Sequence, residues 1–173
     1  DPEPHSEAGF VHQSNLVAGW HQHYFHGATE TLTINTGDVL YAYVYLDPAN
    51  PPSEVMLQWF EAATGWEHRA YWGLDQIGWG TNGAASRRYM GQLPVVGDWV
   101  RLEVPASLVG LEGRTISGMA YTLMGGKVTW DEAGKNDQGG LSTSLAIGKT
   151  ATQSSTVFGG GASRAVDGNP EGN

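Results

Sequence analysis

The chain has 173 residues, with 18 acidic and 9 basic side chains and a formal net charge of −9. Its length suits one domain with a real core, or one domain and part of another. The basic residues are scattered, and a duplex-binding protein presents a basic face, so we expect no nucleic-acid partner. The longest apolar run, residues 39–46, is far shorter than the roughly 20 residues that span a bilayer, so we expect no membrane span. The absence of cysteine excludes disulfides, thiolate metal sites and cysteine nucleophiles.

Short runs of β-branched and aromatic residues, separated by turn residues, dominate the chain. There is no amphipathic helical pattern longer than two turns. The pattern predicts an all-β fold, either an antiparallel sandwich or a barrel. Of these we expect an antiparallel β-sandwich of the jelly-roll type, similar to carbohydrate-binding modules. In chain order, we expect strands at residues 20–25, 30–34, 39–46, 55–60, 66–72, 99–104, 115–123 and 128–131.

A polar, glycine-rich stretch at residues 136–144 predicts a linker. It separates a β-sandwich at residues 1–135 from a final segment at residues 145–173, which is too short to build a core alone. The final segment is either the start of an incomplete second domain or a tail that packs on the first. The chain opens on Asp1-Pro2 without a leader pattern, so we expect a removed leader or a start inside a longer protein.

Alternation along the strands assigns side chains to two faces. Within residues 39–46, three tyrosines fall opposite the aliphatic side chains. Gln58, Arg69 and Tyr71 likewise fall opposite the aliphatic and tryptophan positions of their own strands. An exposed face with rings and hydrogen-bonding groups suits a sugar, because pyranose C–H faces stack on rings while polar groups bind hydroxyls. The alternative is that the tyrosines simply pack in cross-strand pairs.

A long loop after residue 78 carries a ring and two guanidinium groups, and such loops often carry recognition at the rim of a sandwich. The alternative is that Trp79 anchors this loop in the core and that Arg87 or Arg88 pairs with acids. Together, the predicted carbohydrate-binding residues are Tyr43, Gln58, Arg69, Tyr71, Trp79 and Arg88.

Two imidazoles, His21 and His23, share one face of a predicted strand with the spacing of some metal sites. Glu30 or His68 would be the third ligand. The alternative is that these histidines are hydrogen-bonded to the backbone. Many β-sandwiches hold a structural calcium ion with an acid on the final strand, so Asp131 is a candidate calcium ligand.

The sequence gives no positive signal for catalysis. A glycosidase needs two carboxylates about 5–9 Å apart, and the spacing of the candidates singles out no pair. These candidates are Glu54, Glu61, Glu67 and Asp75. No Gly-x-Ser-x-Gly elbow and no phosphate-binding glycine loop occurs. We therefore expect a protein that is not an enzyme, with a polysaccharide lyase or hydrolase as the alternative.

Several longer motifs resemble one family. Residues 37–52, 66–73, 97–105 and 129–131 together resemble a tryptophan-rich sandwich domain of large secreted or envelope proteins of bacteria, including planctomycete cytochrome-type and Rhs-like proteins. The resemblance implies a module that binds carbohydrate or surfaces, located outside the cell or at its surface. That family carries one more strand before the position of Asp1, so the resemblance implies that the first strand is missing here.

The final segment resembles a second family. Residues 145–156 and 163–173 are similar to the opening of a discoidin-type (F5/8 type C) domain, in its fucose-binding lectin branch. The resemblance implies a calcium-binding turn with Asn169, Glu171 and Asn173 as candidate ligands, and calcium as a structural cofactor. Glu171 stands where that branch has Asp, and the remaining ligands would lie beyond Asn173, so such a site would be incomplete in this chain.

These observations predict a non-catalytic module of a larger extracellular or cell-surface bacterial protein. Its expected partner is a polysaccharide or a glycan-bearing surface. The main alternative is an assembly subunit of an extracellular filament or surface layer, whose partners would be other copies of itself.

Overall fold

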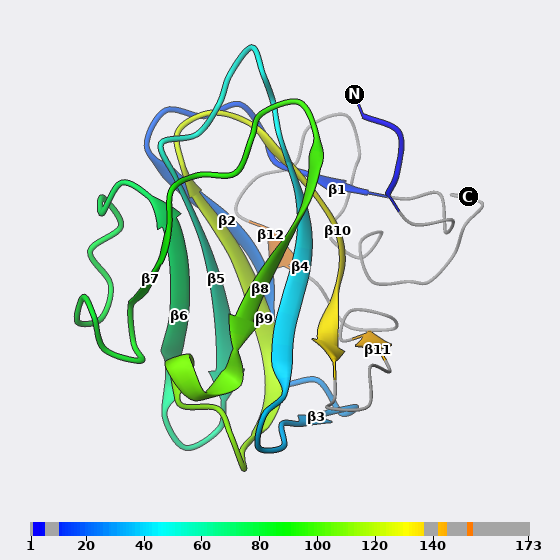
Figure 1. Cartoon of the computed structure of the whole chain (residues 1–173), viewed down its shortest axis with the longest axis vertical. Helices are drawn as coiled ribbons and strands as arrows, with labels where there is room; N and C mark the ends of the chain where they lie inside the picture. The colour runs from blue at the N-terminus through cyan, green and yellow to red at the C-terminus, as the bar shows by residue number, and fades with distance from the viewer. Residues whose placement is uncertain (1, 6–10, 137–141, 145–151, 154–173) are drawn as a thin grey trace.

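The computed structural model describes residues 2–5, 11–136, 142–144 and 152–153, which form two packed β-sheets (Figure 1). The smaller sheet has five strands in the order β1–β10–β4–β8, with β11 also paired to β10. These strands are β1 (His12–Gln13), β4 (Val39–Leu46), β8 (Trp99–Pro105), β10 (Val128–Asn136) and β11 (Ser142–Ser144).

The larger sheet has seven strands in the order β12–β2–β9–β5–β6–β7, with β3 also paired to β9. These strands are β2 (Trp20–Phe25), β3 (Leu32–Thr33), β5 (Glu54–Glu61), β6 (Gly65–Gly73), β7 (Arg88–Gly91), β9 (Thr115–Met124) and β12 (Thr152–Gln153). Every pairing between these strands is antiparallel except that of β6 with β7. The predicted all-β sandwich is therefore confirmed.

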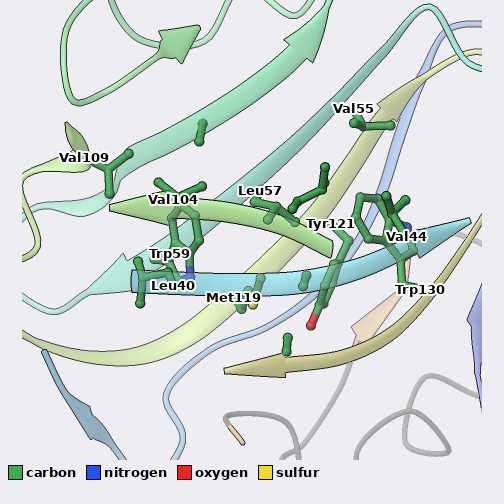
Figure 2. Close-up of a cluster of buried hydrophobic side chains, with 14 of the residues drawn as sticks. Leu40, Val44, Val55, Leu57, Trp59, Val104, Val109, Met119, Tyr121 and Trp130 are labelled. Carbon is green, nitrogen blue, oxygen red and sulfur yellow. The ribbon is translucent and has the colours of Figure 1, made fainter. Parts of the chain in front are cut away.

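The core lies between the two sheets and follows the predicted alternation. On β4, every second side chain from Leu40 to Leu46 is fully buried. On β5, Val55, Leu57 and Trp59 are fully buried in the same cluster. Figure 2 shows side chains of β4 and β8 meeting those of β5 and β9 in this layer. The aliphatic half of each strand pattern therefore supplies the interior, as burial of apolar surface requires.

The last long strand continues further than the sequence pattern predicts. A bulge between Asp131 and Ala133 places Glu132 at φ 28°, and the strand then runs on to Asn136. The bulge inserts one extra residue, which shifts the alternation and hides the second half of the strand from a period-two count. Beyond it, the Lys135 ammonium lies 2.5 Å from a carboxylate oxygen of Asp38, and both side chains are buried. This ion pair ties the end of β10 to the turn that precedes β4.

Among the residues that the structure describes beyond residue 136, there are two short strands. Ser142–Ser144 forms β11 on β10, within the span predicted as a linker, and Thr152–Gln153 forms β12 on β2. The resemblance of residues 145–173 to a second domain stays a prediction, because residues 145–151 and 154–173 lie outside the described residues. Within the described part of the chain, no helix is long and apolar enough to cross a membrane.

Candidate functional site

The predicted binding residues do not share one face. Tyr43 lies on β4 of the smaller sheet, whereas Gln58 on β5 and Arg69 and Tyr71 on β6 lie on the outer face of the larger sheet. Gln58 and Arg69 are direct cross-strand partners. Arg88 is the cross-strand partner of Ala70, a core residue, so it shares the inner side of the sheet, and its Nε donates to the Leu108 carbonyl at 3.3 Å. The expectation of one continuous binding face is therefore wrong.

Gln58, Arg69 and Tyr71 are also buried, with 3%, 7% and 2% of their surface exposed. Alternation predicted their side of the sheet correctly, but the prediction that they face solvent is wrong. The connection between β6 and β7, residues 74–87, supplies groups that contact them, and we call it the covering loop (Figure 1). Arg69 Nη1 donates to the Ser86 carbonyl at 3.0 Å, and the Tyr71 hydroxyl donates to Asn82 Oδ1 at 3.1 Å.

The covering loop is anchored by a buried carboxylate and by apolar contacts. Glu54 Oε2 accepts the backbone N–H groups of Gln76 and Ile77 at 2.6 and 2.9 Å. Burial raises the pKa of Glu54. Gly80 has φ 75°, and a Cβ there would lie 2.3 Å from the Ser86 carbonyl oxygen, so only glycine fits this turn of the loop.

Trp79 and Arg87 hold the covering loop in place. Trp79 packs against a small cluster of Met56, Tyr71 and Ile77 on the outer face, rather than entering the core between the sheets. Arg87 lies 3.5 Å from Asp75, which is the acid pairing that the alternative interpretation predicted.

Beside the covering loop, a hydrogen-bonded row of polar side chains crosses four strands. We call it the polar ladder; its members are Gln22, Thr122, Gln58, Arg69 and Glu67. Thr122 Oγ1 donates to Gln22 Oε1 at 3.1 Å, and Gln58 Nε2 donates to Thr122 Oγ1 at 2.7 Å. Arg69 Nε donates to Gln58 Oε1 at 2.8 Å, and Arg69 Nη2 to Glu67 Oε1 at 3.2 Å. The middle of the ladder is buried, while Gln22 is half-buried and Glu67 is exposed.

Aromatic side chains lie at both ends of this region. At one end, the Trp20 ring is 55% exposed and lies 5.1 Å from the Trp79 ring. At the other end, the Trp66 ring lies within 6.2 Å of three neighbouring rings. These neighbours are Tyr24, His26 and Phe60, none of which is buried. Trp20 and Tyr24 are four residues apart on β2, so they are about 13 Å apart along the strand.

Sequence reasoning missed the contribution of β2 to this face. The signal was available, because residues 20, 22 and 24 alternate with the buried side chains at 21, 23 and 25. What the pattern alone did not indicate was that β2 joins β9 and β5, which brings Gln22 next to Gln58.

The two histidines share one face of β2, as predicted; this is the inner face, and His21 and His23 are both buried. Of the two proposed third ligands, Glu30 and His68, His68 is bound elsewhere: its Nδ1 lies 2.6 Å from the Val109 carbonyl oxygen, and its Nε2 lies 2.8 Å from Thr64 Oγ1. The ring beside His23 is instead that of His12 on β1, at a centroid distance of 3.2 Å. Burial lowers the pKa of His12 to about 4, and burial with the neighbouring His12 and His21 lowers that of His23 well below 6.5.

The part of the chain that the structure describes contains no group of three His, Asp or Glu side chains that could hold a metal ion. Asp131 Oδ1 accepts the backbone N–H of Glu132 at 2.8 Å, so this carboxylate stabilises the bulge in β10. The role of Asp131 as a calcium ligand together with backbone carbonyls stays a prediction. The calcium prediction for Asn169, Glu171 and Asn173 stays a prediction, because all three lie outside the described residues.

The candidate acids have structural partners. An open depression of about 750 Å³ brings Glu61 and Glu112 to one rim. The Glu61 carboxylate accepts hydrogen bonds from Ala63, Thr64 and Arg114, and the first of these is the largest cause of its lowered pKa. Glu112 accepts the Gly37 N–H at 2.8 Å. Both carboxylates thus stabilise turns.

No family model, curated protein or solved structure matches this chain. The two resemblances noted from the sequence therefore stay predictions, and the functional argument depends on the geometry of the site.

Proposed function

We propose that the outer face of the larger sheet binds a glycan chain without catalysing its cleavage. The observation that carries this proposal is the polar ladder, with half-buried or exposed rings on either side of it along the strands. Trp20 at one end and Trp66 at the other would stack on sugar C–H faces, while Gln22 and Glu67 would bind hydroxyl groups between them.

The buried members of the ladder act by positioning. Gln58 is hydrogen-bonded to Thr122 and to Arg69. Through these two side chains it fixes the positions of Gln22 and Glu67 at the ends of the ladder. Polar groups held in place by a packed network lose less conformational freedom on binding than free side chains do. Arg69 and Tyr71, predicted as contact residues, therefore support the site from beneath the covering loop, while Trp79 supports Trp20 by an edge contact.

The protein context of this proposal comes from the sequence. The resemblances to modules of secreted bacterial proteins favour an extracellular or cell-surface location within a longer chain. Binding through one sheet face is weak for each module, and linked modules raise the overall affinity by increasing the effective concentration.

The test is a glycan array with the intact chain and its Trp20→Ala and Trp66→Ala variants. We expect binding of the wild-type chain to at least one polysaccharide and a loss of about tenfold or more in each variant, since stacked rings dominate such sites. Tyr45→Ala is the matched control, because Tyr45 is a half-buried ring on the other sheet. Retained folding is checked by circular dichroism.

Three results would contradict the proposal or favour one of its alternatives. No binding of the wild-type chain to any glycan contradicts the proposal. Self-association that Trp20→Ala abolishes would favour the assembly alternative, in which this face contacts another copy of the chain. Release of new sugar ends from a bound polysaccharide would favour the lyase or hydrolase alternative.

A further inference from the structure

A row of rings also lies on the outer face of the smaller sheet. We call it the aromatic row; it consists of Tyr43 and Tyr45 on β4 and Trp99 on β8, all half-buried. Tyr45 and Trp99 are cross-strand partners with ring centroids 5.8 Å apart. Next to Tyr43 in register is Arg101, whose guanidinium lies 4.0 Å from the Tyr41 ring centroid. This face combines flat rings with hydrogen-bond donors.

Part of the chain's own N-terminal region lies on this row. The His5 ring stacks on the Tyr43 ring at 3.7 Å with an interplanar angle of 23°, and it also lies 6.1 Å from the Trp99 ring in an edge contact. Trp99 Nε1 donates a hydrogen bond to the backbone carbonyl of Glu3 at 2.8 Å. Residues 2–5 belong to no strand of either sheet, so they contact the row through side chains and one carbonyl rather than by extending a sheet.

The composition of residues 2–5 matches this mode of contact. Pro2 and Pro4 are half-buried, whereas Glu3 between them is exposed. Proline fixes φ near −65° and lacks an N–H group, so a proline-flanked segment favours an extended conformation with free carbonyl groups. Aromatic grooves recognise such segments by packing rings against the chain and donating hydrogen bonds to its carbonyls, at a small entropic cost.

We propose that the aromatic row is a binding groove for extended, proline-flanked peptides, and that residues 2–5 occupy it within the same molecule. This proposal is independent of glycan binding on the larger sheet, because it uses the opposite face of the sandwich and different residues. A peptide is favoured over a sugar here, since the group that receives the Trp99 N–H is a backbone carbonyl.

The test measures competition between the resident segment and an added peptide. The probe is a fluorescently labelled peptide with the sequence of residues 1–5, titrated into the full chain and into its Pro2→Gly/Pro4→Gly/His5→Gly variant. We expect the variant to bind the probe at least tenfold more tightly than the wild-type chain does, because a tethered segment competes at a high effective concentration. A probe with alanine in place of both prolines should bind several-fold more weakly.

Two further variants locate the binding. Adding Trp99→Phe to the triple-glycine variant retains a ring but removes the donor, and we expect weaker probe binding. Adding Trp20→Ala, on the larger sheet, should leave probe binding unchanged. In the wild-type chain, the Trp99 indole N–H should exchange with solvent more slowly than in the triple-glycine variant.

The proposal is wrong if the folded triple-glycine variant does not bind the probe at millimolar concentration. It is also wrong if Trp99→Phe has no effect on probe binding. Binding of a glycan, and not of the probe, to the triple-glycine variant would identify this face as a second sugar site instead.

Discussion

The outer faces of the two sheets differ in how far other segments of the chain shield them from solvent, although side chains alternate along their strands in the same way. Each face carries tyrosines and an arginine opposite the aliphatic core positions. Arg69 of the larger sheet is 7% exposed and bonds to Gln58, Ser86 and Glu67. The side chain of Arg101 on the smaller sheet is 26% exposed and lies over the Tyr41 ring. A period-two pattern thus identifies the side of a sheet, while a distant segment determines whether that side meets solvent.

The first prediction exploits this contrast between the two arginines and has the largest expected effect. Arg69→Met should lower the free energy of unfolding by about 3 kcal/mol, because it leaves the buried Gln58 Oε1 and the partly buried Ser86 carbonyl without their charged donor. Arg101→Met should cost less than about 1 kcal/mol, the range of a partly exposed cation–π contact. Urea denaturation of both variants measures the difference. Equal losses would mean that the covering loop does not seal the larger sheet in solution.

The second prediction compares the pH dependence of stability due to histidines on the inner side of the sandwich with that due to a histidine on the outer side. Half-buried His12 and buried His23 are neutral in the folded protein at neutral pH, since desolvation lowers the pKa of His12 from 6.5 to about 4 and that of His23 well below 6.5. Between those values the unfolded chain binds more protons, so stability is complete above about pH 6.5 and falls as the pH drops towards 4. The groups facing this pair are His21 and Tyr121. The shift of His12 alone corresponds to a loss of roughly 3 kcal/mol over this range, and His23 adds to that loss.

Urea unfolding at several pH values checks this. His12→Gln and His23→Gln should each flatten the pH dependence of the free energy of unfolding. His26→Gln, a change to an exposed ring on the outer side near the same strand, is the control and should leave the slope unchanged. A slope that His26→Gln alters and His23→Gln does not would contradict the burial assigned to the inner face.

The third prediction concerns the anchor of the covering loop. Glu54→Ala removes the acceptor of the Gln76 and Ile77 N–H groups, and we expect a loss of about 1–2 kcal/mol with the loop released first. Amide hydrogen exchange should become faster at these two residues while the β4 amides keep their protection. Glu103→Ala, at an exposed acid on the other face, is the control. Unchanged exchange at Ile77 would show that other contacts hold the loop.

The smallest expected effect on stability is at Trp20, an exposed ring beside the polar ladder. Trp20→Ala should change the free energy of unfolding by no more than about 0.5 kcal/mol, because the ring is 55% exposed. The same change should weaken glycan binding about tenfold or more if the proposed face is correct. Thermal unfolding, recorded on the samples used for the glycan array, separates the two effects. A large loss of stability would mean that Trp20 mainly supports the covering loop through Trp79.

The strands with regular alternation were predictable from the sequence. The expected strands at residues 20–25 and 39–46 match β2 and β4 residue for residue. The short strands β1 and β7 were missed, because two to four residues carry too little pattern. The second half of β10 was missed because the bulge at Asp131–Ala133 shifts its period. Of the candidate site, the side of the sheet was predictable for Gln58, Arg69 and Tyr71, but their burial was not.

What the sequence alone determined is the fold class and, in strands without a bulge, the set of side chains that face inward, because alternation within one strand is a local property of the extended backbone. Only the tertiary structure decided which outward side chains reach solvent. That decision depends on segments far away in the chain: residues 74–87 cover the centre of one outer face, and residues 2–5 lie on the other. Contacts between such distant segments depend on how the sheets pair and pack, which no single strand encodes.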